Sequence, residues 1–283
     1  MAQVVRRIAS NDPMALALRL TALGLLLRPV GGPRLRPAFL ALAAFLLVAP
    51  RARYARVGWA ALLVLAVARL VADWPLGDNH AYLLAYWCLA VTLAFGDVDP
   101  RGALAENGRL LIGLTFAFAI LWKAVLSSDF ADGTFFRVTI LADPRLAGLA
   151  PVASGLSPED LSRWRDWIGG HALASEAPGP VPTRLAAVAG VATAWTLLIE
   201  AAAAASFLAP SRWRLARARD ALLVVFCATT YAVIPVTGFA WLLLAMGAAQ
   251  SSPERSAWRA AYVAVFVWVA FAAALHGAVR TPV

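Results

Sequence analysis

Residues 110–126 read LLIGLTFAFAILWKAVL, and this stretch decides the fold class. Only Thr115 and Lys123 carry polar side chains in it, and its length approaches the roughly 20 apolar residues that a membrane-spanning helix needs. The whole chain has the same character, since 61% of its 283 residues are hydrophobic and 14% are charged. A soluble core has no room for that apolar surplus. The sequence therefore predicts an all-α polytopic transmembrane helix bundle that forms a single domain over residues 1–283.

Apolar stretches of this kind give about eight membrane segments in all. They lie near 13–30, 37–50, 57–73, 80–96, 109–127, 184–209, 221–247 and 257–278. The first two are short and are joined by a turn containing Gly31, Gly32 and Pro33, so they form either a tight hairpin or incomplete spans. The seventh contains Pro235 and Gly238, and for it we prefer one kinked helix over two half-helices.

Arginine clusters at 51–56 and 212–219 orient the predicted bundle. They fall on one side of the membrane if the segments alternate, and loops rich in arginine face the cytoplasm. The N-terminus is then cytoplasmic, and the long connection 128–183 faces outward. The net charge of +9 is explained by these arginines against an anionic leaflet. We therefore expect membrane lipid as a partner and no nucleic acid.

The outer connection 128–183 carries the signature of a helix start at Ser157. A serine cap, Pro158 in the first turn and two acidic residues after it are typical of a helix N-terminus. Apolar residues then recur at helical spacing up to Gly169, which predicts a short interfacial helix near 157–170. This helix either plugs the ends of the bundle or contacts a substrate.

Charged groups within the spans need an explanation, because each costs about 2.5–3.5 kcal/mol on insertion scales. Lys123 is the only lysine among 25 basic residues. Desolvation favours a neutral amine that can act as a base or nucleophile, although a lysine near a helix end also snorkels to the interface. Glu200 is explained by an ion pair with Arg19, by a sequestered protonated state or by a proton relay.

His80 opens the fourth stretch at its outer end, and Lys123 lies about one turn from the outer end of the fifth. Because consecutive segments run antiparallel, we expect both side chains to converge on one pocket in the outer leaflet. The alternative for His80 is a hydrogen bond to a backbone carbonyl near the interface. Trp122 and Tyr82 add aromatic surface, which serves either a membrane-interface belt or a cavity for a quinone-like ring.

No metal or hydrolase motif is visible in the sequence. Cys88 and Cys227 fall in separate apolar runs without metal-ligand spacing. A Gly-rich phosphate loop, a serine nucleophile elbow and a His-Glu-x-x-His motif are all lacking. We therefore expect no bound metal and no standard hydrolase reaction.

A family resemblance follows from three pieces of sequence. These are residues 78–84, which read Asp-Asn-His-Ala-Tyr-Leu-Leu, then Trp122-Lys123, and then residues 128–133, which read Ser-Asp-Phe-Ala-Asp-Gly. Together they resemble the membrane domain of vitamin K-dependent gamma-carboxylase, which bacterial relatives carry as the HTTM (horizontally transferred transmembrane) domain. The resemblance covers most of the chain, and its most specific part is Asn-His-x-Tyr-Leu with a lysine one span later.

The resemblance implies a definite chemistry. The lysine at the position of Lys123 is the base that deprotonates reduced vitamin K hydroquinone, and reaction with O2 creates a stronger base that removes a proton from glutamate before CO2 adds. His80 matches a histidine in the same site. A reduced quinone, O2 and CO2 are the cofactors implied, and a bacterial inner membrane is the location. The residues expected around the substrate are Asn79, Tyr82, Trp122 and Asp129, with Glu200 as a proton relay.

Other functions stay open at this point. The lysine pair of the animal enzyme is here Trp122-Lys123, so glutamate carboxylation is less well supported than quinol chemistry. A non-catalytic bundle that binds lipid, or assists export or maturation of a protein partner, is the main alternative. It predicts tolerance of Lys123→Arg and sensitivity in 161–168. A small-molecule transporter is a third option, supported by the broken seventh segment.

Overall fold

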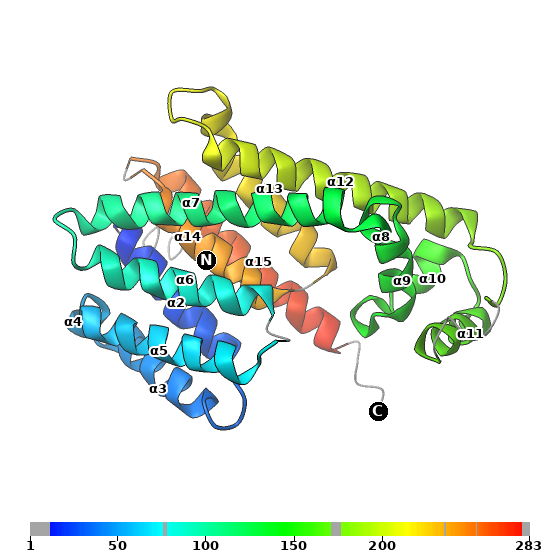
Figure 1. The fold of residues 1–283 in the computed structure, drawn as a ribbon, viewed down its shortest axis with the longest axis horizontal. Helices are drawn as coiled ribbons and strands as arrows, with labels where there is room; N and C mark the ends of the chain where they lie inside the picture. The colour runs from blue at the N-terminus through cyan, green and yellow to red at the C-terminus, as the bar shows by residue number, and fades with distance from the viewer. Residues whose placement is uncertain (1–11, 76–77, 171–176, 235, 253, 279–283) are drawn as a thin grey trace.

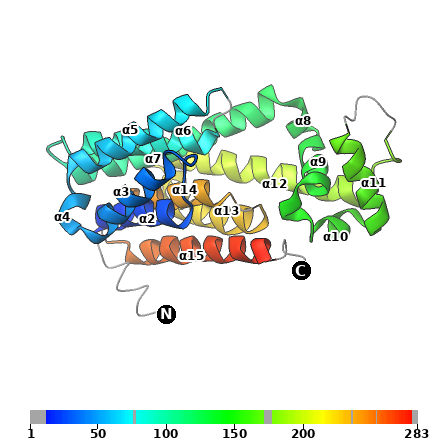
Figure 2. The same cartoon turned by 90° about the horizontal axis from the view of Figure 1, so that it is seen from below.

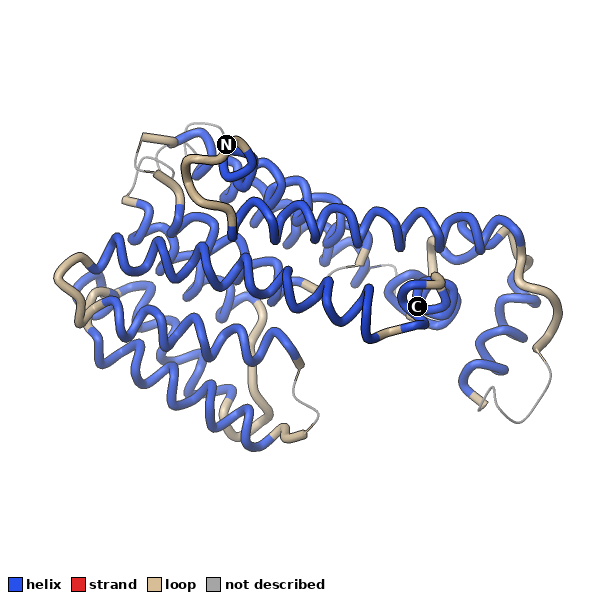
Figure 3. The backbone as a smooth tube through the Cα atoms, turned by 45° about the horizontal axis from the view of Figure 1, so that its top comes forward, coloured by secondary structure: helices blue, strands red, loops and turns tan. Residues whose placement is uncertain are grey.

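Helices make up the regular structure of the computed structural model, which describes residues 12–75, 78–170, 177–234, 236–252 and 254–278 (Figures 1 and 3). No strand occurs in these ranges. The helices in chain order are α2 (Pro13–Leu27), α3 (Arg36–Val48), α4 (Pro50–Arg53), α5 (Arg56–Ala72), α6 (Asn79–Ala94), α7 (Pro100–Leu121), the π-helical turn η1 (Trp122–Leu126), α8 (Ser128–Ala131), α9 (Thr134–Ala142), η2 (Pro144–Leu146), α10 (Ala150–Ser154), α11 (Pro158–Gly169), α12 (Thr183–Leu208), η3 (Leu215–Ala218), α13 (Arg219–Val233), α14 (Thr237–Gln250) and α15 (Ser256–Ala278). The predicted all-α class is confirmed.

Three helical segments within the described chain are long and apolar enough to cross a membrane. They are Pro100–Leu126, which joins α7 to η1, Thr183–Leu208 and Ser256–Leu275. Shorter apolar helices lie at Pro13–Leu27, Arg36–Val48 and Thr237–Gln250. Length and composition thus support membrane insertion of the bundle.

α14 is the central helix of the bundle. Its residues from Ala240 to Gln250 are all buried, and it packs against α2, α7, α13 and α15. Figure 2 shows α15 on one face of this centre and α5 with α6 on the opposite face. A helix that is apolar all round requires such burial, and the sequence of α14 is apolar apart from its first and last residues.

The segment 221–247 forms two helices, so the single kinked helix preferred from the sequence is wrong. α13 ends at Val233 and α14 begins at Thr237. Gln250 at the end of α14 donates a hydrogen bond to Asp220 at the start of α13, so the two helices form an antiparallel hairpin. Proline removes a backbone donor and disfavours a helical residue before it, which explains a break near Pro235.

Both arginine clusters lie at the same end of the bundle, as the alternation of segments predicts. Arg109 in the first half of α7 donates to the carbonyl of Phe207 near the end of α12, so the α6–α7 turn and the α12–α13 connection are neighbours. Gly96 in the α6–α7 turn lies beside Arg56. Arg53 has a structural task, because it is buried and donates to the carbonyl of Leu46 at 3.0 Å.

Helices α8 to α11 form a second, smaller unit on the first half of α12. Its buried side chains include Phe130, Phe136 and Leu185. α11 occupies Pro158–Gly169 with Ser157 as its cap, at the position that the sequence predicts. Leu161 and Trp164 are buried in this unit, so the apolar face of α11 packs against its own neighbours.

A glycine at the centre of the bundle gives a stability prediction. At Gly247 an added Cβ would lie 2.7 Å from Tyr262 Cε1 and 2.8 Å from Leu223 Cδ2. Overpacking of this kind costs about 1–3 kcal/mol, so Gly247→Ala is expected to lower the melting temperature in detergent. Gly190 is exposed on α12, and an added Cβ there would have nothing within 4 Å. Gly190→Ala is therefore the matched control and should not destabilise the protein. Equal melting temperatures of the two variants would contradict the close packing.

Candidate functional site

A cavity of about 820 Å³ opens between α6, α7 and the α13–α14 hairpin. Its charged and polar lining comes from six elements or connections of the chain. These residues are Arg28, Asp78, Asn79, His80, Thr115, Lys123, Arg145 and Glu200. Sequence positions as far apart as Arg28 and Glu200 therefore share one site.

Lys123 and Glu200 form an ion pair at the cavity wall. Lys123 Nζ lies 2.5 Å from Glu200 Oε1, and the two side chains are 19% and 6% exposed. Nζ also lies 5.1 Å from the ring centroid of Phe130, within range of a cation–π contact. The sequence offers Arg19 as the ion-pair partner of Glu200, and that pairing is wrong, because the carboxylate is bonded to Lys123.

The other carboxylate oxygen of this pair has no protein donor. Glu200 Oε2 is buried and accepts no hydrogen bond from the residues that the structure describes. Glu200 lines the cavity, and a buried carboxylate oxygen without a donor is a strong acceptor for a hydroxyl or a water molecule. The pair can therefore interact with a ligand through the amine and through the carboxylate.

The backbone at Lys123 departs from the α-helix. α7 ends at Leu121, and Trp122–Leu126 continue as a π-helical turn. Such turns are rare and frequently occur at functional sites, because they widen the helix and redirect its side chains. The widened turn holds Lys123 against α12, where Glu200 lies.

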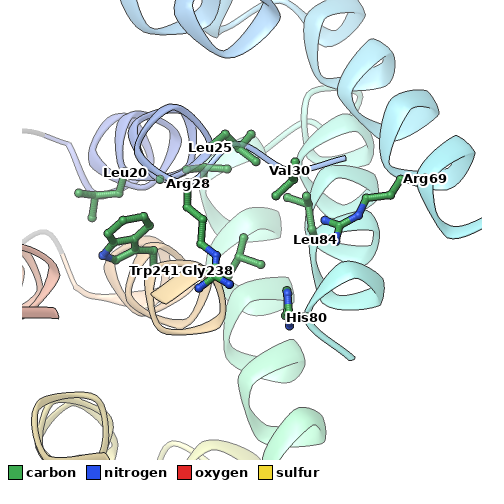
Figure 4. A pocket seen from close by; sticks show the side chains of 12 residues that line it. Leu20, Leu25, Arg28, Val30, Arg69, His80, Leu84, Gly238 and Trp241 are labelled. Atoms are coloured by element: carbon green, nitrogen blue, oxygen red, sulfur yellow. The ribbon is translucent and has the colours of Figure 1, made fainter. Parts of the chain in front are cut away.

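His80 lies at the start of α6 and lines the same cavity. Its Nε2 is 3.4 Å from an Asp78 carboxylate oxygen, and its side chain is 21% exposed. Figure 4 shows the imidazole at the edge of a smaller neighbouring pocket, with Arg28 and Arg69 above it. The predicted convergence of His80 and Lys123 on one cavity is thus observed, at the end of the bundle opposite the arginine clusters.

Aromatic rings form the apolar part of the cavity. Phe116 and Phe239 lie deep in it, while Tyr86, Phe118 and Trp122 are at least half exposed at its mouth. The exposed rings belong to α6 and to α7 with η1, so the cavity opens sideways between these segments.

The other expected residues divide into two groups. Asn79, Tyr82 and Trp122 line the cavity with His80 and Lys123. Asp129 is exposed on α8 and is not part of the cavity lining. Its predicted contact with a substrate has no support from its position.

Two arginines of the cavity are not anticipated from the sequence. Arg28 follows α2 and donates from Nη1 to Thr237 Oγ1 at 2.7 Å. Arg145 reaches the cavity from η2. It donates side-chain hydrogen bonds to Asp143, and these raise the pKa of Arg145 above its ordinary value, so Arg145 stays charged. Arg28 lies near the end of the stretch 13–30, where an arginine is ordinarily assigned to the membrane interface, and Arg145 lies in the connection 128–183, so a search for charges within the spans misses both.

The arrangement suits proton transfer to or from an aromatic ligand. An amine and a carboxylate that share a proton are neutral as a pair whichever partner holds it. When Glu200 holds the proton, the Lys123 amine has a free electron pair and is a base within reach of the cavity. Among the described residues no group of three or more His, Cys, Asp or Glu side chains is placed to hold a metal ion.

The chain was also compared with known proteins. Neither protein-family models, nor curated proteins, nor solved structures gave a match.

Proposed function

We propose that this chain is a multi-pass protein of a bacterial inner membrane, related to the HTTM domain, and that its cavity binds a reduced quinone. The observation that carries the proposal is the Lys123–Glu200 pair in the wall of a cavity of about 820 Å³ with aromatic lining. The reaction would be of the oxygenase type or, with CO2, of the carboxylase type.

The proposed membrane region comprises α2, α3, α5, α6, α7 with η1, α12, the α13–α14 hairpin and α15. Helices of 15 and 14 residues, such as α13 and α14, extend about 22 Å and do not cross a hydrocarbon core of about 30 Å alone. The hairpin therefore turns within the membrane. Irregular backbone at that depth needs protein or a cavity beside it, and Val236 in the turn lines the cavity.

With this hairpin the N-terminus stays cytoplasmic and the last helix changes direction. The chain returns to the cytoplasmic side at the end of α14, so α15 runs outward. The arginine clusters are then at the cytoplasmic end, and the unit α8–α11 is on the outer side, as the positive-inside rule requires.

The cavity residues fit a reduced quinone in three respects. The rings of Phe116, Phe118 and Phe239 can stack on its ring, the sideways opening admits a lipid-soluble molecule, and the polar groups can bond its hydroxyls. A bound quinol supplies hydroxyl protons and the electrons for reaction with O2. Lys123 Nζ would accept a proton from a hydroxyl once its own proton has passed to Glu200, and His80 would orient the ring by a hydrogen bond.

The non-catalytic alternative receives less support from the outer unit. If α11 recruited a protein partner, its apolar residues would have to be accessible. Leu161 and Trp164 are 3% and 7% exposed, so substitutions there are expected to act through the packing of the outer unit. α11 packs on α9 and α10, so this burial supports a role in holding the outer unit together.

Retention of a quinone tests the proposal directly. Mass spectrometry of the protein purified in mild detergent should detect a bound quinone, and added vitamin K hydroquinone under anaerobic conditions should raise the melting temperature. Ala119 lines the cavity, so Ala119→Phe is expected to remove both signals by filling the space. Ala201 is exposed on α12, so Ala201→Phe adds the same ring outside the cavity and should change neither. If Ala119→Phe retains the quinone, or the wild-type protein gains no stability, the proposal fails.

A further inference from the structure

Another pocket, of about 250 Å³, adjoins both the large cavity and the smaller pocket of Figure 4. It is more polar than the pocket of Figure 4. It lies where α2 and α5 end and where α6 and α14 begin, and Gly31 and Gly32 leave its rim free of side chains. Gly31 adopts φ +85°, a conformation that favours glycine, so the turn keeps this bare rim.

The charge in this pocket is predominantly positive. Arg28, Arg36 and Arg69 line it, against the carboxylates of Asp73 and Asp78. Asp73 is 3.2 Å from Arg69 Nε and is 44% exposed, and Asp78 is 66% exposed. Arg28 and Arg36 are exposed as well, whereas the Arg69 side chain is 14% exposed, so water screens the charge of Arg69 least. The pocket therefore attracts an anion.

The guanidinium groups of Arg28 and Arg69 have N–H donors that lack a hydrogen-bond acceptor in the described part of the protein. Thr237 accepts one hydrogen bond from Arg28 and supplies no charge. Nη1 of Arg69 is buried and has no hydrogen-bond partner among the described residues. A buried donor without an acceptor is unfavourable, and an anion in the pocket supplies the missing acceptor.

The two arginines approach the pocket from different helices. Figure 4 shows Arg28 descending from α2 and Arg69 reaching in from α5, with His80 below them. An added Cβ at Gly238 would lie 3.8 Å from Arg28 Cδ and 4.0 Å from His80 Cδ2, so the start of α14 closes the site. Planar guanidinium groups on two sides match the oxygen atoms of a phosphate, which arginine binds through paired hydrogen bonds.

The position in the bundle indicates where the phosphate comes from. Five helices end or begin at this pocket, so in the proposed membrane orientation it lies on the outer side of the bundle, at the depth where the α13–α14 hairpin turns. Arginine is disfavoured on that side by the positive-inside rule, yet Arg28, Arg36 and Arg69 all occur there. A bound anionic group accounts for their presence.

We propose that this pocket binds a phosphate group, carried by the headgroup of an anionic phospholipid or free in solution. The site is separate from the Lys123–Glu200 wall, although it shares Arg28, Asp78 and His80 with the large cavity. The protein would then keep a phosphate-bearing ligand at one fixed place near the cavity mouth.

The test compares two phosphate sources on the full chain in non-ionic detergent, without quinone. Dioctanoyl phosphatidylglycerol and sodium phosphate are added separately, with sodium chloride at equal ionic strength as the reference, and the melting temperature is measured. We expect a rise of a few degrees beyond sodium chloride. A rise with the lipid alone identifies a headgroup site, and a rise with sodium phosphate identifies a site for the free ion.

Matched variants separate the pocket from general surface charge. Arg28→Gln and Arg69→Gln should each lose most of the rise. Arg34→Gln removes the same charge from the exposed 28–36 loop, outside the pocket, and should keep it. An equal loss in all three variants, or no rise above sodium chloride with either phosphate source, overturns the proposal. Since each variant is compared with and without ligand, a lower starting melting temperature does not obscure the result.

Discussion

Lys123→Arg is expected to lower quinol-dependent O2 consumption by a factor of about 100 or more while the bundle stays folded. Arginine preserves the positive charge and can still pair with Glu200, but it does not give up its proton in proteins and therefore fails as a base. The measurement is the rate of O2 uptake with vitamin K hydroquinone, together with the melting temperature of each variant.

The same substitution separates the two candidate functions. A bundle that needs only a charge at position 123 tolerates arginine, so full quinol-dependent activity of Lys123→Arg would refute the base. Glu200→Gln is the companion variant, because it keeps the size of the side chain and removes the proton acceptor. We expect it to lower the rate, because a glutamine amide cannot take up the proton that must leave the Lys123 ammonium group before the amine acts as a base.

Asp220→Ala is expected to be the most destabilising of the substitutions considered. Asp220 is 2% exposed, and its Oδ1 accepts hydrogen bonds from Tyr262 at 2.6 Å and from Gln250 at 2.5 Å. Its Oδ2 lies 3.5 Å from Arg255 Nη1. These bonds join the ends of α13, α14 and α15 at the cytoplasmic end of the proposed bundle.

Removal of that carboxylate leaves buried donors unpaired and an uncompensated arginine. Loss of one partner from such a network costs about 3–5 kcal/mol, which corresponds to a drop of roughly 10 °C in melting temperature for a chain of this size. Glu254 is exposed next to Arg255, so Glu254→Ala removes the same charge at the same end and should change the melting temperature little. Similar losses in the two variants would show that Asp220 does not tie the helices together.

The apolar pattern predicts most of the helices, and its failures have physical causes. The stretch 184–209 coincides with α12, and 109–127 matches the later part of α7 together with η1, although α7 begins nine residues earlier, at Pro100. The segment 221–247 does not correspond to one helix. Hydropathy measures apolar content and carries no information on a change of chain direction. Pro235 and Gly238 mark the break, but a kink and a hairpin leave the same residues in the sequence.

The sequence predicts the site residues whose place follows from their position along a helix. It does not predict contacts that depend on which distant helices pack together. His80 and Lys123 share a cavity because α6 and α7 run antiparallel and both residues lie at the end remote from the turn that joins these helices, although Lys123 is nine residues farther from that turn. The partner of Glu200 depends on which helices touch, and the packing of α7 on α12 favours Lys123 over Arg19. Arg28 and Arg145 reach the cavity from helix ends and loops, where arginine usually lies at an interface and gives no signal of its own.

The sideways opening between α6 and α7 has a consequence for how the proposed reaction would saturate. A ligand that passes Tyr86, Phe118 and Trp122 arrives from the hydrocarbon phase, so the concentration it presents to the cavity is its mole fraction in the bilayer. Dilution of a vesicle suspension with buffer should leave the occupancy unchanged. Fusion with vesicles that carry no quinone should lower it, although the total amount of quinone in the sample stays the same.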